Sequence, residues 1–514
     1  MGGDIIMAKF HISKNGLPAL CKAEKGKCPL GDNKEHFSSL ESAQIYADKV
    51  NEEKYGLIAE VKSKDITIED KIGKYLESFH SKVLKSLSDS GHQAYIIGGS
   101  VRDNALDMPS NDVDIATSAT PEETIEVFNE YEYLTDGNEH GTVPIIVNGE
   151  ALEITTFRQD GEYSDGRRPD KVTFTKSLEE DVMRRDFTIN AIAYNEEDGI
   201  VDLVGGVADI ENRVIRTIGD PDKRFKEDPL RMMRGLRFAS TLGFNIDNET
   251  EKAIINNKDL LKNVSSERLQ SEFNKLIKGK SASEVLTKYP KVISTFIPEI
   301  EPMIGFDQRN PNHIYDVWEH TAVVVQNSDD DLAHKLAGVF HDIGKPSTFT
   351  YDEEKQTGRF FGHAEESVKI ADKAMRNLKY ENNIRERVLN IIEDHDRHLS
   401  QKPNKIKVEI FNKGPERYFD MINFKRADDS AKNPNKKDMY GDYDKIENIA
   451  KEYLKGNPIL SHKDLAIKPK DIVDLGYKGP EIGEALNQLS LLAISGHKNE
   501  RESQINHLKK NGIL

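Results

Sequence analysis

The spacing of hydrophobic residues divides the chain into a mixed region and a long helical region. Phe79, Val83 and Leu87 recur at the spacing of one helix face, and Ser90-Gly91 ends that helix. Short apolar runs typical of strands follow at 94–97, 112–116, 142–147, 152–157, 171–174 and 200–203. Beyond Glu211 the pattern is helical almost to the end, interrupted by proline and glycine. We therefore expect an α+β head with a mixed sheet, followed by an all-helical body.

Composition narrows the class of protein. The chain has 514 residues, enough for three or four domains, and its 37% hydrophobic and 31% charged residues are typical of a folded, charge-rich protein. No apolar run approaches the ~20 residues that span a bilayer, and the first residues lack the pattern of a secretory signal. The two cysteines argue against a disulfide scaffold. We expect a cytoplasmic protein without a membrane partner.

The net charge changes the expectation for nucleic-acid partners. A formal charge of −17 repels phosphates at long range and is more typical of an enzyme with a small substrate. A nucleic-acid enzyme with this charge must gather its lysines and arginines on one face. The motifs described below favour a nucleic-acid enzyme more strongly than the net charge argues against one.

The first candidate site combines a glycine pair with carboxylates. Gly98-Gly99 follows a buried strand, where its backbone can approach a phosphate closely. Asp112 and Asp114 are two residues apart on a predicted strand, so both side chains leave the same face. An isolated Asp-x-Asp is more often a solvated strand edge, but here apolar residues alternate with the carboxylates, and such a pair suits Mg²⁺. Glu153 is either an exposed strand residue or a third carboxylate for two-metal catalysis.

A second segment combines a helix start with three arginines. Asp228 and Pro229 are typical of an N-cap and the first residue of a helix. Arg231, Arg234 and Arg237 follow at intervals of three and sweep along one side of that helix. Arginines on a helix are usually only solvated, but apolar residues fill the other positions, so the arginine side is a defined surface. Guanidinium groups there can bind phosphates or base edges.

These motifs, in this order, resemble the bacterial-type (class II) family of CCA-adding enzymes and poly(A) polymerases. The resemblance spans about residues 75–280 and includes the runs GGSVRD at 98–103, RRDFTIN at 184–190 and EDPLR at 227–231. It implies a polymerase-β-like nucleotidyltransferase head and a helical neck that act on the 3′ end of tRNA with CTP and ATP. It also implies that Asp112 and Asp114 bind Mg²⁺.

The resemblance further implies a set of nucleotide contacts. These are Gly99 and Arg102 for the triphosphate, Arg185 with Asp186 and Asn190 near the ribose, Asp228 and Arg231 for the base edge, and Arg234 and Arg237 as further nucleotide or phosphate contacts. An Asp acceptor beside an Arg donor can hydrogen-bond a base edge without a template. The glycine- and charge-rich segment 158–170 is similar to the family's flexible loop, which switches C addition to A addition, and so argues against an enzyme that adds only C.

The helical body holds a second group of candidate ligands. A lone histidine on a helix is more often a packed core residue, but adjacent His341-Asp342 with further histidines on either side favours a metal site. The segment resembles HD-type phosphohydrolases, which implies the ligands His320, His341, Asp342 and Asp428, with His363 and His395 of two-metal versions. We expect a divalent transition metal (Ni, Mn, Co, Fe or Zn). Cyclic 2′,3′-phosphates, 2′-nucleotides and phosphomonoesters are candidate substrates, and a domain that only holds tRNA is the alternative.

Residues 1–62 have no counterpart in either resemblance. His11, Cys21, Cys28 and His36 are a legitimate zinc combination, but their spacing is not that of a zinc finger. Free thiols and surface histidines are the favoured interpretation, and zinc binding stays open.

The combined hypothesis divides the chain into five parts: an accessory module at 1–62, a nucleotidyltransferase head at 70–215, a neck at 216–300, an HD domain at 310–432 and a helical tail at 433–514. The tail resembles the family's tRNA-facing helices, one of which would begin at Gly479-Pro480. The tRNA 3′ hydroxyl would attack the α-phosphate of CTP or ATP and release pyrophosphate. The alternatives are an A-adding enzyme or poly(A) polymerase, a metal phosphohydrolase with an RNA-recognition head, and a non-catalytic tRNA-binding module. The oligomeric state is open.

Overall fold

The computed structural model describes residues 10–12, 18–20, 67–74, 76, 78–108, 110, 113–134, 141–147, 149–161, 166, 171–435 and 442–512. The chain forms two units, one of residues 1–76 with 104–108 and the other of residues 77–103 with 109–514. In the first unit, β1 (Phe10–Ile12) pairs antiparallel with β2 (Pro18–Leu20), and α2 spans Ile68–Lys74. Of the zinc combination, only the backbone of His11 is described, and Cys21, Cys28 and His36 lie outside the described residues.

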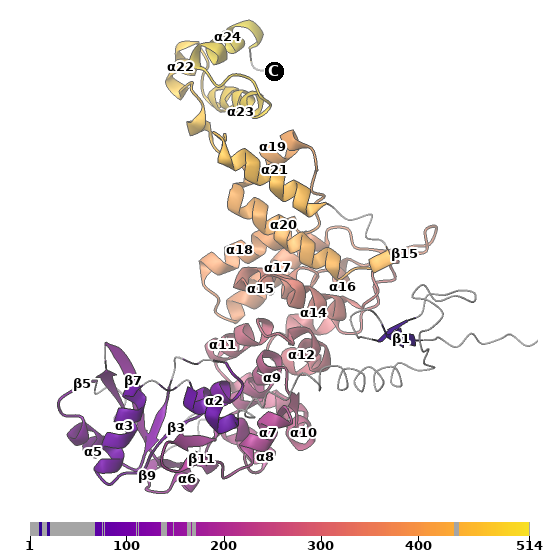
Figure 1. Cartoon of the computed structure of the whole chain (residues 1–514). Coiled ribbons are helices and arrows are strands. Elements are labelled where there is room, and N and C mark those ends of the chain that lie inside the picture. Colours follow the sequence, from indigo (N-terminus) through magenta and orange to yellow (C-terminus); the bar gives the residue numbers. More distant parts are fainter. Residues whose placement is uncertain are drawn as a thin grey trace, which may run out of the picture. The chain divides into compact units, whose positions relative to one another are not determined.

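The head is built on a mixed sheet (Figure 1). Within the described residues its seven strands run in the order β11-β10-β3-β4-β7-β6-β5, and β4 and β7 are parallel while the other neighbours are antiparallel. The strands are β3 (Ala94–Ile97), β4 (Ile115–Thr117), β5 (Glu132–Tyr133), β6 (Thr142–Val147), β7 (Glu150–Thr156), β10 (Ala193–Asn195) and β11 (Gly199–Val201). All four residues of β3 are buried, as its uninterrupted apolar run predicts.

Helices and a hairpin complete the head. The helices are α3 (Ser78–Asp89), α4 (Gly99–Ala105), α5 (Pro121–Val127), α6 (Leu178–Met183) and α7 (Gly206–Glu211), with a 3₁₀ turn η2 (Thr188–Asn190). The hairpin pairs β8 (Arg158–Asp160) with β9 (Val172–Phe174). Helix α5 packs on β6 and β7, and its N-terminus is closed by a capping box between Thr120 and Glu123.

The sequence predicts some of these strands more accurately than others. The runs 94–97 and 142–147 coincide with β3 and β6. The expected strand 112–116 is wrong at its start, because the ladder with β7 begins at Ile115 and Asp114 immediately precedes the strand. Strand β10 was not predicted, since three residues are too short to display a period of two.

The neck consists of helices around a buried central helix. Its elements are α8 (Pro221–Glu227), α9 (Leu230–Leu242), α10 (Asn248–Asn257), η3 (Lys258–Asn263), α11 (Ser266–Ile277), α12 (Ala282–Lys288), α13 (Pro290–Ile293) and η4 (Pro298–Met303), with a parallel pair of β12 (Val214–Ile215) and β13 (Asn245–Ile246). Helix α9 packs against α11 and α12 and is buried on most of its surface. The expected exposed arginine face is therefore only partly present, because Arg231 is 8% exposed.

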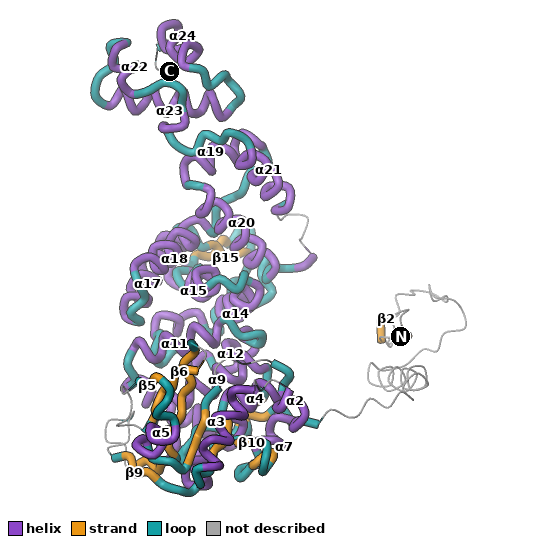
Figure 2. The backbone as a smooth tube through the Cα atoms, turned by 60° about the vertical axis from the view of Figure 1, so that its left-hand side comes forward, coloured by secondary structure: helices purple, strands orange, loops and turns teal. Residues whose placement is uncertain are grey.

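A third group of helices follows the neck (Figure 2). It contains α14 (Val317–Asn327), α15 (Leu332–Phe340), α16 (Lys345–Thr348), α17 (His363–Asn377), α18 (Asn382–Asp394) and α20 (Pro415–Ser430), with a hairpin of β14 (Thr350–Asp352) and β15 (Thr357–Arg359). Helices α14, α15, α18 and α20 pack on one another, and their side chains Trp318, Phe340 and Phe424 are buried. A capping box between Asp316 and Glu319 fixes the N-terminus of α14, and the N-cap residue Asp316 precedes His320 by four positions.

The remaining helices form two smaller apolar clusters. They are α19 (Pro403–Lys413), α21 (Tyr443–Lys455), η6 (His462–Asp464), α22 (Pro469–Asp474), α23 (Pro480–Ile494) and α24 (Arg501–Asn511). Helices α19, α20 and α21 share one cluster, and α22, α23 and α24 share the other. Helix α23 begins at Pro480 after Gly479, as expected. Among the described residues, no helix is long and apolar enough to cross a membrane.

Candidate functional site

The turn after β3 gathers the first group of predicted residues. Gly98 has a φ of +94°, in the region that favours glycine. A Cβ atom there would lie 3.6 Å from Nη1 of Arg185, 3.8 Å from Oδ2 of Asp114 and 3.9 Å from the carbonyl oxygen of Asn190. The positive φ favours glycine at this position, and the three predicted residues lie together around it. Asp112 lies outside the described residues.

The register of the sheet relates Asp114 to Glu153. Strand β4 pairs with β7 through Ile115 and Ile154, so continuing the parallel register by one residue brings Asp114 beside Glu153. Neighbouring residues in register leave the same face of a sheet from strands about 4.8 Å apart. Both side chains are exposed. The register therefore places Asp114 and Glu153 next to each other at the start of the β4–β7 ladder.

A polar network connects the glycine turn to the neck. Arg102 donates to Oδ1 of Asn190 at 2.5 Å, and the Nδ2 of Asn190 donates to Asp186 at 3.2 Å. Asp186 also accepts from Nη2 of Arg234 on α9 at 2.6 Å. Burial raises the pKa of Asp186, but the charge of Arg234 and the hydrogen bonds from Asn190 and Phe187 outweigh it and lower the pKa to about 2. The carboxylate is ionised and fixed, so it can orient its neighbours rather than exchange protons.

The two residues expected to recognise the base each have a different partner. Oδ2 of Asp228 accepts from Nη2 of Arg268 on α11 at 2.8 Å, and its Oδ1 caps the backbone of Leu230 at 3.1 Å. Arg231 donates to Glu227 at 2.8 Å. The N-cap of α9 is Pro229, one residue later than the sequence predicts, and Asp228 ends α8. The partner Arg268 was missed because no local pattern connects residues forty positions apart.

The other predicted arginines are also held by carboxylates. Arg185 pairs with Asp181 at 2.9 Å, and Arg237 pairs with Glu272 on α11 at 3.0 Å. Burial lowers the pKa of Arg237, and the charge of Glu272 partly offsets this effect. These ion pairs hold extended side chains in fixed orientations, a form of preorganisation that suits the recognition of a polyanion.

The second site brings together all six residues predicted from the helical body. His320 comes from α14, His341 and Asp342 from the turn that ends α15, His363 from the first turn of α17, His395 from the end of α18, and Asp428 from α20. All six are buried. His341 is the C-cap of α15 and keeps helical backbone angles, Asp342 follows in the turn, and both side chains face the same centre.

Asp342 occupies the middle of this cluster. Its Oδ2 lies 3.2 Å from Nε2 of His341 and 3.5 Å from Nε2 of His320. Its Oδ1 lies 3.6 Å from the Nε2 atoms of both His363 and His395. The ligand atoms therefore form two groups that share Asp342, each compact enough to hold a metal ion. Asp428 adjoins the first group, with Oδ1 at 3.2 Å from Nε2 of His320.

Backbone carbonyl groups set the tautomer of three of these histidines. The Nδ1 atoms of His341, His363 and His395 lie 2.9, 2.8 and 2.6 Å from the carbonyl oxygens of Gly338, Phe360 and Ile392. An Nδ1–H that donates to a carbonyl leaves a lone pair on Nε2, which is the tautomer of a metal-ligating histidine. Burial lowers the pKa of His363, which favours the same neutral form. A cation between such lone pairs and the carboxylate of Asp342 would be bound by both.

Two polar residues at this centre were missed by the sequence reasoning. Lys345 follows Asp342 by one helical turn, and its Nζ lies 2.7 Å from Oδ2 of Asp342. This spacing along the chain could have revealed the contact. His313 lies 5.1 Å from the ring of His320, and burial lowers the pKa of His313 to about 2. Burial raises the pKa of Asp342, but the charge of Lys345 is among the interactions that lower it well below its usual value.

A glycine beside the cluster fixes the position of His363. A Cβ atom on Gly344 would lie 2.6 Å from the carbonyl oxygen of His363 and 2.7 Å from the amide of Ser367. We therefore expect Gly344→Ala to displace the start of α17, destabilise the protein by about 2 kcal/mol as overpacking does and weaken metal binding. Thermal unfolding and metal analysis would measure both effects. Gly483→Ala, where the added methyl meets open space, is the control; full metal loading in Gly344→Ala would contradict the assignment of His363.

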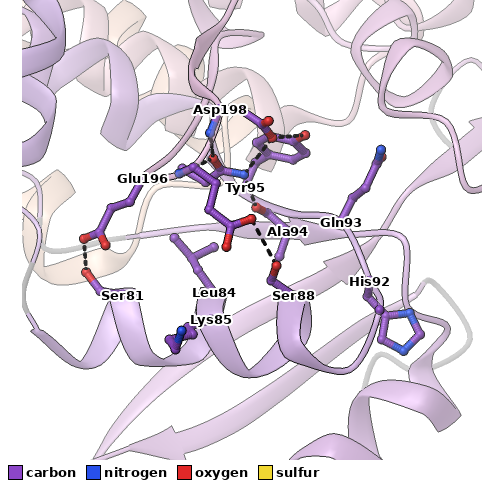
Figure 3. Close-up of a pocket in the computed structure, with 13 residues that line it drawn as sticks. Ser81, Leu84, Lys85, Ser88, His92, Gln93, Ala94, Tyr95, Glu196 and Asp198 are labelled. Atoms are coloured by element: carbon purple, nitrogen blue, oxygen red, sulfur yellow. Dashed lines mark hydrogen bonds between the residues drawn. The ribbon is translucent and has the colours of Figure 1, made fainter.

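A separate pocket of about 440 Å³ lies on the head between α3 and the turn joining β10 to β11 (Figure 3). Ser81 donates to Glu196 at 2.6 Å, and Tyr95 donates to Asp198 at 2.8 Å. Burial and the hydrogen bond to Asp198 raise the pKa of Tyr95 to about 12. The pocket contains none of the predicted site residues, and its carboxylates hold α3 against the sheet.

Comparison with protein families agrees with this geometry. Residues 94–216 match the model of the poly A polymerase head domain, residues 243–291 match the probable RNA and SrmB- binding site of polymerase A, and residues 312–438 match the HD domain. The fold and the two sites thus define a nucleotidyltransferase with an appended HD domain.

Relatives identify the family within that class. A CCA-adding enzyme of Lactobacillus helveticus is 35% identical over 424 residues, which cover 80% of this chain and 92% of the relative. A CCA-adding enzyme of Geobacillus thermodenitrificans is 49% identical over 217 residues, 42% of this chain and 53% of the relative. The chain belongs to the family of CCA-adding enzymes.

Solved structures share the fold. A CCA-adding enzyme of Bacillus stearothermophilus in complex with CTP matches 85% of this chain and 98% of its own, with a TM-score of 0.61 and 29% identity. A CCA-adding enzyme of Thermotoga maritima complexed with tRNA matches 86% of this chain and 98% of its own, with a TM-score of 0.53 and 17% identity. The expected head, helical body and HD domain are confirmed.

Proposed function

We propose that the head adds C and then A to the 3′ end of tRNA from CTP and ATP, without a template. The terminal 3′ hydroxyl oxygen forms a bond to the α-phosphorus, the bond to the β-phosphate bridging oxygen breaks, and pyrophosphate leaves with the negative charge. The observation that carries this proposal is the 35% identity to the CCA-adding enzyme of Lactobacillus helveticus over 80% of this chain and 92% of that relative. The resemblance of the sequence 158–170 to the family's segment for switching from C to A supports addition of A as well as C.

We assign the catalytic carboxylates to Asp112, Asp114 and Glu153. The convergence of Asp114 on the glycine turn, with Glu153 in register beside it, supports this assignment. Hard carboxylate oxygens beside substrate phosphates suit Mg²⁺, which would neutralise charge on the triphosphate. Asp114 would orient the attacking hydroxyl and the α-phosphate relative to each other.

The triphosphate would lie against the glycine turn. Its contacts are Gly99, Arg102 and Arg185, with Asn190 and the ionised Asp186 beside the ribose. The network from Arg102 through Asn190 to Asp186 supports this assignment, because it fixes one donor for phosphate and one acceptor for a ribose hydroxyl. Arg234 and Arg237 would extend the same surface toward the neck.

Base selection would fall to Asp228 and Arg231. We expect Asp228→Ala and Arg231→Ala to change the relative kcat/KM among CTP, ATP, UTP and GTP by about 10-fold or more, since each would lose contacts to a base edge worth ~1–3 kcal/mol. Steady-state incorporation with each nucleotide would measure this, and filter binding of tRNA should change little. An unchanged order of preference in both variants would exclude them from base recognition. Arg224→Ala, which removes another arginine paired with Glu227, is the matched control.

The HD domain would be a metal-dependent phosphohydrolase. The tautomers of its histidines and the two ligand groups that share Asp342 support this function over a purely structural role. Imidazole-rich sites favour Ni, Mn, Co, Fe or Zn, and such an ion supplies Lewis-acid activation of a phosphoester. Water oxygen would bond to phosphorus, the ester P–O bond would break, and the leaving alcohol would take the proton.

The division of the chain at 62, 215, 300 and 432 also stays our proposal, supported by the ranges of the three family matches. The neck and tail would hold the tRNA. We place the protein in the cytoplasm, which is consistent with its two cysteines.

A further inference from the structure

An unusual aromatic side chain adjoins the HD site. Phe361 is 74% exposed, more than any other large hydrophobic residue that the structure describes. It lies at a pocket of about 600 Å³ whose lining includes Asp342, His363 and His395. A single exposed hydrophobic side chain is not unusual in itself, but the position of this ring at the pocket that holds two predicted metal ligands makes it available to a ligand there.

The element that carries Phe361 is held firmly in place. The amide of Gly358 donates to the carbonyl oxygen of Arg309 at 2.7 Å, and a Cβ atom on Gly358 would lie 2.2 Å from the carbonyl oxygen of Gln308. The neighbouring Phe360 packs on Phe349 with ring centroids 5.6 Å apart. The β14–β15 hairpin therefore presents Phe361 from a packed base.

The same segment fixes the distance between Phe361 and the metal ligands. The carbonyl oxygen of Phe360 lies 2.8 Å from Nδ1 of His363, so the segment orients that imidazole. Gly362, with a φ of +75°, permits the turn between the two residues. Two peptide units separate the Cα atoms of Phe361 and His363 by at most ~7 Å. The aromatic face is thus within the reach of one nucleotide from the metal ligands.

Cationic side chains line the pocket together with carboxylates. Lys345 pairs with Asp342 at 2.7 Å, and Lys432 pairs with Asp428 at 2.7 Å. The guanidinium of Arg359 lies 5.6 Å from the ring of Phe361 and pairs with Asp352. Lys345, Lys425 and Lys432 line the pocket with it. An aromatic face next to cations is the combination that proteins use to bind single-stranded nucleotides, in which the base stacks and the phosphate meets the charge.

We propose that Phe361 stacks on the nucleobase of the phosphoester that the HD domain hydrolyses, and so selects nucleotides over phosphoesters without a base. The proposal rests on the proposed hydrolase function and names the substrate class of that site. A free mononucleotide and the 3′-terminal nucleotide of an RNA share this chemistry. Arg359 sets the orientation of the ring and contributes charge toward the phosphate.

The experiment compares substrates with and without a base, using the full-length protein loaded with Mn²⁺ or Ni²⁺. The substrates are adenosine 2′-phosphate, a short oligoribonucleotide that ends in a 2′-phosphate, and abasic ribose 2-phosphate. We expect Phe361→Ala to lower kcat/KM about 10-fold for the base-bearing substrates through a higher KM, and to leave the abasic substrate unchanged. Phe361→Trp should restore the wild-type values. Tyr131→Ala, which removes another exposed aromatic residue from the head, is the control.

The outcomes distinguish a failure of base stacking by Phe361 from a failure of the proposed hydrolase function. A loss confined to the oligonucleotide supports stacking and identifies an RNA end as the source, and a loss confined to the mononucleotide identifies a free nucleotide. Equal losses with the abasic substrate, or no loss at all, would overturn the role of Phe361. If the wild-type protein hydrolyses none of the three, the hydrolase function fails. Stacking is then tested by tryptophan fluorescence of the Phe361→Trp variant, with the wild-type protein and its single tryptophan as the reference. Quenching by adenosine 2′-phosphate but not by ribose 2-phosphate supports stacking. Equal signals with the two compounds overturn it.

Discussion

Replacing Asp114 with asparagine is expected to lower the rate of nucleotide incorporation into tRNA on the order of 10³-fold, the scale of losing preorganised stabilisation of transition-state charge. The change keeps the size of the side chain and removes its negative charge. Asp114 is exposed and immediately precedes β4, so we expect the substitution to leave the fold unchanged. Asp112→Asn is expected to have the same effect. Single-turnover incorporation of labelled CTP would measure the loss.

The control for this experiment is Glu122→Gln, which removes an exposed carboxylate from α5 of the same domain. It should keep the wild-type rate. Asp114→Asn should also keep the wild-type melting temperature and the wild-type affinity for tRNA, which shows that the loss lies in chemistry. Turnover within a few-fold of wild type in Asp114→Asn would mean that the head binds its metal elsewhere.

Replacing Asp342 with asparagine is expected to remove metal from the HD domain and to lower phosphoester hydrolysis at least about 100-fold, since even the loss of an outer-shell partner of a metal ligand costs 10–100-fold. Asp342 belongs to both ligand groups, so a single change affects both positions. The double variant His341→Ala with Asp342→Ala should have the same result. Elemental analysis after reloading with Mn²⁺ or Ni²⁺ would count the ions, about one or two per chain in the wild type if each group binds one.

The two sites should respond independently. Asp342→Asn is expected to add nucleotides to tRNA at the wild-type rate, because the proposed Mg²⁺ ligands of the head belong to other elements of the chain. Asp396→Asn, which changes an exposed carboxylate at the rim of the same pocket, is the matched control and should keep both metal and hydrolysis. If the wild-type protein retains no ion under any loading condition and hydrolyses no phosphoester, the HD domain is a tRNA-binding scaffold instead.

Local patterns in the sequence predicted the parts of the molecule that depend on neighbouring residues. The uninterrupted apolar run of β3 identified a buried strand, and Asp228 with Pro229 identified the start of α9 within a residue. The six HD residues were predicted as a set because their side-chain chemistry is unusual, and the structure brings all of them to one centre.

Other features depend on contacts between distant residues and could not be predicted. The pairing of Asp228 with Arg268 joins α9 to α11 across the neck, and no spacing along the chain indicates it. The burial of Arg231 has the same origin, because α9 is covered by helices from later in the sequence. Asp342 was expected as one ligand among several, but its central position depends on how four helix ends meet.

The central claim is that this chain builds the CCA end of tRNA. Its most direct test uses three tRNA transcripts: one that lacks the whole CCA end, one that ends with its first C and one that ends with CC. Each would be incubated with the purified protein, Mg²⁺ and labelled CTP and ATP, and the products would be resolved at single-nucleotide resolution. The account predicts that all three are extended to CCA and no further, with C added only to the first two. Extension of the third transcript alone, or a long run of A on each, would contradict it and identify an A-adding enzyme or a poly(A) polymerase.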